Sequence, residues 1–289
     1  MENSIVRVET KDGFHLHGLL SESVKKDTII IHMHGSAGNF YTSAFFSEYR
    51  TNVDVWNCSF LSTNSRGTGV YDVEVGTKYR GAAIELFEEC LLDIDAWIEF
   101  VLEKGYKQIL LQGHSFGTNK VQYYALNGKY HNKVKALILL GFTDSFGTQL
   151  QYLKRINKTN KEYLDEANNL LKQQKPLQLL SDLYANCGEL PQTAQSYVSL
   201  MSEDSALSNV LPLRNGKNLL NYSKIEIPIL GVIGDQNEYT VIPIKDAITL
   251  MKSENHLATI SQISNCSHGF EGKEKELGNI VQQFLGSIV

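Results

Sequence analysis

The stretch Lys107-Gln-Ile-Leu-Leu-Gln-Gly-His-Ser-Phe-Gly-Thr-Asn-Lys120 decides how this chain folds. An apolar run that ends at Leu111 is followed by Gly-His-Ser-Phe-Gly and then by residues typical of a helix. Strand, sharp turn and helix around G-x-S-x-G form a nucleophile elbow, in which the turn strains the serine backbone and exposes the hydroxyl. Glycine on both flanks avoids a collision between side chains. We therefore predict that Ser115 is a nucleophile at the end of a buried strand.

The composition of the chain is that of an ordinary soluble protein, with 289 residues, 42% hydrophobic residues and a net charge of −5. This charge gives no basic surface for nucleic acid, so we expect no nucleic-acid partner. The N-terminus lacks the apolar core of a signal peptide and no 18-residue apolar run occurs, which predicts a cytoplasmic protein with no membrane partner. The four cysteines are scattered, and we expect reduced thiols and neither a metal nor an organic cofactor. They are Cys58, Cys90, Cys187 and Cys266.

Segments with the pattern of strands alternate with segments that have the 3.6-residue period of helices. Strands are expected at residues 5–9, 14–20, 28–33, 53–60, 109–111, 135–141, 227–233 and 257–263. Amphipathic helices are expected at residues 84–101 and 277–285. The first two strands would form an antiparallel hairpin at a sheet edge. Strands that alternate with helices imply right-handed βαβ units and an α/β fold with a mainly parallel central sheet flanked by helices.

The pattern changes between residues 146 and 223, where Lys, Asn, Gln and Glu dominate and β-branched runs disappear. Leu and Tyr recur through this segment, and residues 163–172 have a helical pattern, so we interpret it as a packed insertion rather than a linker. The predicted organisation is a core domain of residues 1–145 and 224–289, with a helical cap of residues 146–223 inserted in it.

A serine hydroxyl needs a base to take its proton, and the base needs an acid to orient it. In chain order the elbow serine is followed by the acid and then by histidine. Asp235 directly follows an expected strand, and His268 lies in a loop before the last helix. The predicted triad is Ser115, Asp235 and His268. Glu238, three residues after Asp235, and Asp144, just past the strand that follows the elbow, stay open as alternative acids.

The tetrahedral intermediate of acyl transfer needs two N–H donors for its oxyanion. Phe116, which follows the nucleophile, would supply one donor. The loop His34-Gly35-Ser36 would supply the other through the Ser36 amide, and Gly35 and Gly38 would let the backbone approach a substrate closely. We therefore expect the oxyanion hole to be formed by Ser36 and Phe116.

Other polar motifs have plainer explanations. His15-Leu-His17 and His32-Met-His34 each place two imidazoles on one face of a strand, but the remaining ligands of a metal site are missing, so packing histidines are expected. Arg66 could bind a substrate carboxylate, and a structural ion pair that fixes its loop is the favoured interpretation.

The elbow, His34-Gly35, the Asn64-x-Arg66-Gly67-x-Gly69 loop, Asp235 and His268 together resemble the α/β-hydrolase superfamily. Within it the chain looks most like small bacterial serine esterases of the feruloyl or cinnamoyl esterase type. This resemblance implies an α/β-hydrolase fold with a cap inserted after the strand that follows the elbow. The chain departs from these esterases in its long polar cap, and in Phe116 where they often have glutamine.

The expected function is hydrolysis of a carboxylic ester of a small or medium-sized organic molecule, through an acyl-enzyme on Ser115. The same triad could serve a thioesterase, an amidase or an acyltransferase. The fold could also carry a non-catalytic small-molecule binding module or, more remotely, a cofactor-free haloperoxidase. Oligomeric state stays open. The residues expected to contact the substrate are Gly35, His114, Phe40, Tyr41 and Phe142, with Phe45 and Phe146 as further aromatic candidates.

Overall fold

A central sheet of eight strands organises the protein, which is described by a computed structural model over residues 3–73 and 78–288. The strand order is β1-β2-β4-β3-β7-β8-β9-β10. Strand β2 runs antiparallel to both of its neighbours, and every other neighbouring pair in this sheet is parallel. The strands are β1 (Asn3–Glu9), β2 (His15–Ser21), β3 (Thr28–Met33), β4 (Ser59–Thr63), β7 (Gln108–His114), β8 (Val134–Leu140), β9 (Ile229–Ile233) and β10 (Ala258–Gln262). The predicted edge hairpin and mainly parallel sheet are both confirmed.

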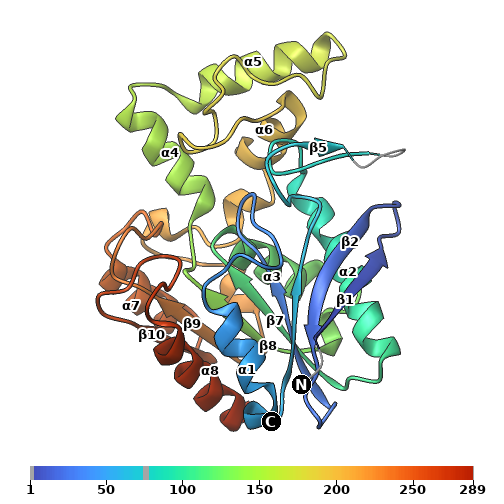
Figure 1. Cartoon of the computed structure of the whole chain (residues 1–289). Helices are drawn as coiled ribbons and strands as arrows, with labels where there is room; N and C mark the ends of the chain where they lie inside the picture. The colour runs from blue at the N-terminus through green and yellow to red at the C-terminus, as the bar shows by residue number, and fades with distance from the viewer. Residues whose placement is uncertain (1–2, 74–77, 289) are drawn as a thin grey trace.

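Helices cover both faces of this sheet, as Figure 1 shows. Successive side chains of a strand point to opposite faces, so Ile29 and Ile31 of β3 belong to one hydrophobic core and Ile30 belongs to the other. The first core includes buried side chains of α2 and α3, and the second includes those of α1 and α8. The helices of the described residues are α1 (Phe46–Trp56), α2 (Cys90–Glu103), α3 (Phe116–Asn127), α4 (Ser145–Arg155), α5 (Asn160–Lys172), α6 (Ala194–Met201), α7 (Ile244–Glu254) and α8 (Glu274–Ile288).

Short elements complete the described chain. A two-stranded ribbon pairs β5 with β6, apart from the central sheet. The ribbon is β5 (Asp72–Val73) and β6 (Tyr79–Arg80), and the 3-10 turns are η1 (Phe87–Glu89), η2 (His131–Lys133), η3 (Leu207–Asn209), η4 (Leu213–Asn215) and η5 (Tyr222–Lys224). In the described parts of the chain, none of the helices has the length and apolarity needed to cross a membrane.

Two predicted elements begin six residues earlier than the elements in the structure. Residues 53–56, predicted as the start of a strand, end helix α1 instead, because Phe46, Tyr49 and Val53 recur at helical spacing and bury one face. Asn57, with φ of 50°, terminates this helix, and the strand begins two residues later as β4. The helix predicted from residue 84 begins only at Cys90, after the turn η1. Residues 82–86 are therefore a connecting segment, and Glu85 in this segment lines the pocket described below.

Helices α4, α5 and α6 come between β8 and β9 and lie above one end of the sheet in Figure 1. The helix expected at residues 163–172 is confirmed as α5, which begins one turn earlier. Thr159 and Glu162 form a capping box there, in which each side chain accepts a hydrogen bond from the backbone N–H of the other residue. The polar insertion is thus folded onto the core. Its limits at residues 146 and 223 stay a prediction.

Candidate active site

Ser115 lies in a strained turn between β7 and α3. Its φ is 54° and its ψ is −126°, a backbone conformation that residues other than glycine adopt rarely. The backbone around it is tightly packed: a Cβ atom on Gly113 would lie 2.3 Å from the carbonyl oxygen of Gly117, and one on Gly117 would lie 2.3 Å from that of Met33. Both flanking glycines are therefore required for the elbow to form.

His268 lies in the loop between β10 and α8, with its Nδ1 atom 2.6 Å from Oε2 of Glu238. A carboxylate only accepts, so Nδ1 carries the proton and Nε2 is left with a free lone pair. Within residues 3–73 and 78–288 that Nε2 atom is buried and has no hydrogen-bond partner. The Glu238 side chain is 1% exposed, and its other oxygen accepts a hydrogen bond from the Gly234 amide at 2.9 Å. The imidazole is thus held in the tautomer that a general base requires.

The predicted acid, Asp235, does not contact His268 and needs correction. Its carboxylate is exposed and accepts hydrogen bonds from the amides of Asn265 and Cys266 at 2.9 and 3.0 Å. The hydrogen bonds from Cys266 and Asn265 lower the pKa of Asp235. The chain then turns through Asn237, with φ of 57°, and Glu238 rather than Asp235 reaches the imidazole. Asp235 instead fixes the loop that carries the histidine.

The second alternative acid, Asp144, is occupied elsewhere. It is 2% exposed and accepts hydrogen bonds from the Gly147 amide at 2.8 Å, from the Arg214 amide at 2.8 Å and from Arg214 Nη1 at 2.7 Å. Burial raises the pKa of Asp144, and the charge of Arg214 opposes that rise. Asp144 therefore caps the N-terminus of α4. Through Arg214 it also binds the turn η4 to this end of α4.

The loop after β3 approaches the nucleophile closely. A Cβ atom on Gly35 would lie 3.0 Å from Cβ of Ser115. His34 Nδ1 donates to the Gly35 carbonyl oxygen at 2.6 Å, and burial, followed by the charge of Lys120, lowers the pKa of His34 to about 3. In a trans peptide the C=O and N–H point in opposite directions. The bond from His34 to Gly35 therefore turns the Ser36 amide away from His34.

Two backbone amides are available beside Ser115. The Ser36 amide and the Phe116 amide, at the first position of α3, donate to no protein group in the described part of the chain. Both residues line the same pocket as Ser115. This placement is compatible with the expected oxyanion hole, whose assignment stays a prediction.

The remaining histidines near the site have structural roles. Nε2 of His114 donates to the His268 carbonyl oxygen at 2.8 Å, and burial, followed by the neighbouring His268, lowers the pKa of His114 to about 4. His32 is fully buried and pairs with Gln112 at 2.8 Å, so His32 and His34 are directed to different partners. Over the described ranges no group of three or more His, Cys, Asp and Glu side chains is arranged to hold a metal ion.

Arg66 is a structural residue, in agreement with the favoured interpretation of the sequence. Its guanidinium is 3% exposed and forms ion pairs with Asp93 at 2.9 Å, Glu89 at 2.7 Å and Asp12 at 3.1 Å. Burial opposes the charge, but the Asp93 carboxylate, followed by Glu89 and Asp12, raises the pKa of Arg66. These pairs fix a loop that lies against the loop after β3, where Thr68 pairs with Ala37.

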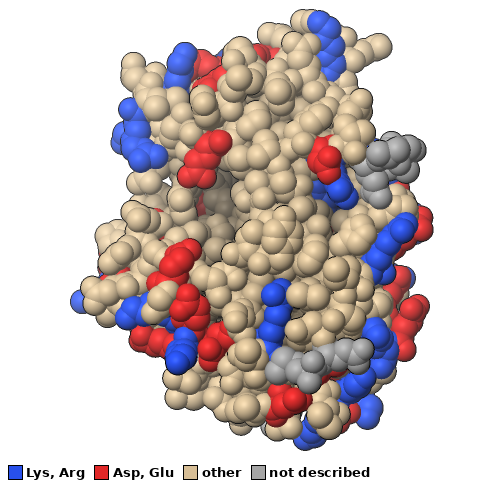
Figure 2. Space-filling view, in the orientation of Figure 1, with Lys and Arg blue, Asp and Glu red and all other residues tan. Residues whose placement is uncertain are grey.

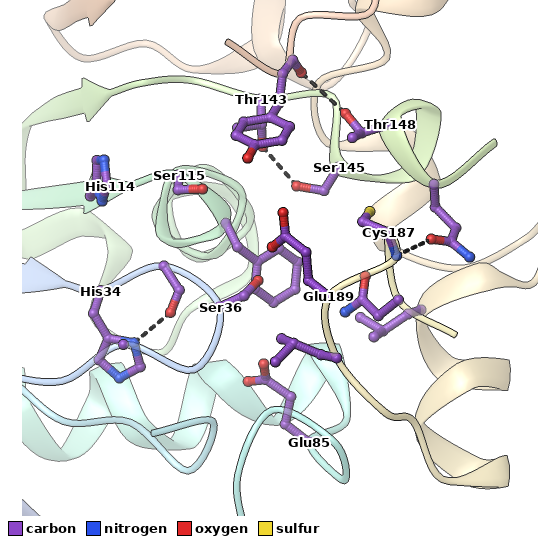
Figure 3. A pocket seen from close by; sticks show the side chains of 18 of the residues that line it. His34, Ser36, Glu85, His114, Ser115, Thr143, Ser145, Thr148, Cys187 and Glu189 are labelled. Carbon is purple, nitrogen blue, oxygen red and sulfur yellow. Dashed lines mark hydrogen bonds between the residues drawn. The ribbon is translucent and has the colours of Figure 1, made fainter. Parts of the chain in front are cut away.

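A cavity of about 350 Å³ opens between the core and the inserted helices, with Ser115 and His268 on its wall. Figure 2 shows the surface hollowed below the upper helices, with acidic side chains on either side of the hollow, and Figure 3 shows its interior. The inserted segment between β8 and β9 contributes much of the wall. Its lining residues are Thr143, Ser145, Thr148, Gln149, Asn186, Cys187, Glu189, Leu190, Gln192, Tyr197, Leu200, Met201 and Leu207.

Of the five residues expected to contact the substrate, Gly35 and His114 line this cavity, and Phe40, Tyr41 and Phe142 do not. Phe142 is fully buried in the core, and Tyr41 is 62% exposed and packs edge-to-face on Phe40 outside the lining. Phe45 and Phe146 are likewise core residues.

The aromatic side chains that do line the cavity are those of Phe116, Tyr197 and Tyr239. Sequence reasoning also missed the pocket carboxylates of Glu85 and Glu189. Neither of these two lies in a recognisable motif.

Solved structures of esterases and lipases share this fold at low sequence identity. Est1E from Butyrivibrio proteoclasticus with bound ferulic acid is 17% identical, with a TM-score of 0.65 and 98% of each chain covered. A thermostable carboxyl esterase from Bacillus coagulans is 14% identical, with a TM-score of 0.68, over 100% of this chain and 99% of that one. A soluble variant of monoglyceride lipase from Saccharomyces cerevisiae is 14% identical, with a TM-score of 0.67, and the match covers 100% of this chain and 96% of the lipase chain.

These similarities confirm the α/β-hydrolase fold. No curated protein matches the chain by sequence. The family model described as "Protein of unknown function (DUF1749)" matches residues 62–279, which include the elbow and the Glu238–His268 pair. The chain therefore belongs to the DUF1749 family, with the fold of the α/β hydrolases.

Proposed function

We propose that this protein is a serine hydrolase that cleaves a carboxylic ester of a small or medium-sized organic molecule through an acyl-enzyme on Ser115. The observation that carries the proposal is the Glu238–His268 pair, whose free Nε2 lone pair lies in the same pocket as a serine in a strained elbow. As the Ser115 hydroxyl attacks the ester carbonyl, His268 takes its proton at Nε2. Glu238 orients the imidazole and stabilises the imidazolium that forms.

The oxyanion of the tetrahedral intermediate would accept hydrogen bonds from the amides of Ser36 and Phe116, which have no protein acceptor among the described residues. His268 then returns its proton to the leaving alcohol. In the second half of the reaction His268 deprotonates a water molecule, which attacks the acyl carbonyl. The bond from the acyl carbon to Oγ of Ser115 then breaks, His268 returns the proton to Oγ, and the carboxylic acid leaves. Residues 146–223 form the proposed cap, and the rest of the chain forms the core that carries the triad.

Ester hydrolysis is favoured over other acyl transfers because the solved relatives of this fold include a carboxyl esterase and a monoglyceride lipase. The direct test is hydrolysis of p-nitrophenyl acetate and butyrate by the wild type and by Ser115→Ala. Loss of the nucleophile should lower kcat by about 10⁴-fold or more. Equal hydrolysis by the two proteins would contradict the proposal.

A further inference from the structure

Glu85 places a buried carboxylate in the wall of the pocket. Its side chain is 4% exposed, and Oε2 accepts a hydrogen bond from Nζ of Lys120 at 2.6 Å, which is itself 1% exposed. Within residues 3–73 and 78–288 the hydrogen bond to this carboxylate goes to Oε2, and none goes to the other oxygen, Oε1. In Figure 3 the carboxylate points into the space bordered by Ser36 and Ser115. One oxygen is thus paired with the core, and the other faces the cavity.

Core and cap together hold Glu85 in this position. The main-chain carbonyl of Glu85 accepts a hydrogen bond from Oγ of Ser196 on α6 at 2.7 Å. Two residues earlier, the Ala83 carbonyl accepts one from the Thr193 amide at 2.8 Å. Gly67 leaves room for the carboxylate, since a Cβ atom there would lie 2.2 Å from Oε2. A polar group fixed from several sides loses little conformational entropy when it binds a ligand group.

Stability alone does not account for this ion pair. Taking a lysine and a carboxylate out of water has a large desolvation cost, and apolar residues of similar volume often stabilise a fold equally well. Oε2 is taken up by the ion pair with Nζ of Lys120, and Oε1 has no donor among the described residues, so the pocket wall presents a carboxylate oxygen with free lone pairs. Such an oxygen only accepts, so its best partner is a hydrogen-bond donor.

The pocket contains a second carboxylate besides that of Glu85. The carboxylate of Glu189 also points into the space in Figure 3 and has no ion pair among the described residues. No Lys or Arg is among the described residues that line the cavity, and the depressed pKa values of His34 and His114 keep their imidazoles neutral near pH 7. A ligand with a carboxylate or phosphate group would meet repulsion there, whereas a hydroxyl or ammonium group would not.

We propose that Glu85 is a specificity-determining residue whose Oε1 accepts a hydrogen bond from the substrate. The substrate class would be esters that carry a hydroxyl or ammonium group on the acyl or the alcohol part. This inference rests on the proposed function, because it names the substrate class of the same site.

The experiment compares kcat/KM, by titration of the acid released, in two matched series of esters. The acyl series is methyl heptanoate, methyl 6-hydroxyhexanoate, methyl 6-aminohexanoate and monomethyl pimelate. The alcohol series is heptyl acetate, 6-hydroxyhexyl acetate and 6-aminohexyl acetate. In one series the wild type should prefer a donor-bearing ester over its alkyl counterpart by about tenfold or more, as a hydrogen bond to a charged group allows. The relative rates of the hydroxyl and ammonium members tell which donor the site takes, and monomethyl pimelate should be the slowest member.

Glu85→Gln should reduce the preference for the ammonium member by about tenfold. Because Glu85→Gln leaves Lys120 buried without its partner, the double variant Glu85→Leu/Lys120→Met removes both charges and should lose the preference for any donor. The matched control is Glu88→Gln, which changes an exposed carboxylate of the same segment outside the pocket lining and should keep the wild-type preference.

A wild type that shows no preference for a donor in either series, or a preference that survives in the double variant, would overturn the inference and leave ester hydrolysis intact. Failure of the proposed function looks different. In that case no member of either series would be cleaved at a rate that depends on Ser115, and the inference would fall with it.

Discussion

Oε2 of Glu238 lies 2.6 Å from Nδ1 of His268, and Oε1 of the same carboxylate accepts the Gly234 amide at 2.9 Å. The pair is buried at the glutamate end, where the side chain is 1% exposed. Glu238 follows β9 and His268 follows β10, and in the proposed mechanism they are the acid and the base that serve the serine of the elbow. Asp235, the acid closer to the end of β9, holds the backbone of the histidine loop.

Glu238→Gln should lower kcat strongly and leave KM nearly unchanged, because an amide favours the wrong imidazole tautomer and cannot stabilise the imidazolium. The expected loss is about 10³- to 10⁴-fold. Steady-state kinetics on a p-nitrophenyl ester measures it.

Asp235→Asn is the matched control, since it removes a negative charge three residues away. It should cost less than about tenfold in kcat and appear mainly as a lower Tm, because the loop around Asn265 loses charge-assisted hydrogen bonds. A larger loss of kcat for Asp235→Asn than for Glu238→Gln would show that the acid is Asp235 after all.

His34→Ala should impair the oxyanion hole without touching the triad. The Gly35 carbonyl would keep the hydrogen bond from the Gly38 amide at 3.1 Å but lose the shorter one from His34 at 2.6 Å, so the Ser36 amide of the same peptide would be held less firmly. We expect kcat to fall by about 10²-fold, as for the removal of one oxyanion donor, with a smaller change in KM. His32→Asn, at a buried histidine of the same strand end, should lower stability but keep the kcat of the folded protein. Similar kcat values for the two variants would argue against the orienting role of His34.

Stability should fall as the medium becomes acidic, in part through His114. Its pKa is about 4 in the fold, below the ordinary value of 6.5, so the unfolded chain binds the proton first. The stability from the neutral imidazole is fully present above about pH 6.5 and is lost as the pH falls toward 4. His114→Gln removes this titration and should reduce the slope of unfolding free energy against pH by up to about 1 kcal/mol per pH unit in this range. Urea unfolding at several pH values checks it, and parallel curves for the two proteins would refute it.

Asp144→Asn should destabilise the contact between α4 and η4 while sparing catalysis. Arg214, which is 20% exposed, would lose its ionic partner, and we expect a loss of about 1–3 kcal/mol in the free energy of unfolding. Thermal and urea unfolding measure it, and kcat of the folded variant serves as the control. A fall in kcat like that of Glu238→Gln, with stability unchanged, would place Asp144 in the triad.

The parts of the site that the sequence predicts well are those that local backbone geometry requires. The elbow is recognisable from Gly113, Ser115 and Gly117 because a single tight turn requires glycine at both flanking positions. His268 could be placed because it follows the last strand. The same local logic identifies the buried strand β3 from its β-branched run.

The choice between Asp235 and Glu238 could not be made by such logic. Both carboxylates follow β9, and which one reaches His268 depends on the turn through Asn237 and on a loop that lies about thirty residues later in the chain. Contacts between segments distant in sequence carry no local signature. The position of Glu85 in the pocket could not be predicted for the same reason. Its side chain pairs with Lys120, 35 residues away, and its carbonyl binds Ser196, 111 residues away.

The central claim is that Ser115 is activated by His268, and intact-mass spectrometry after treatment with a fluorophosphonate tests it most directly. The wild type should gain one adduct, and Ser115→Ala, treated in the same way, should gain none. A well-folded wild type that gains no adduct, or a Ser115→Ala variant that gains one as readily as the wild type, would contradict the account.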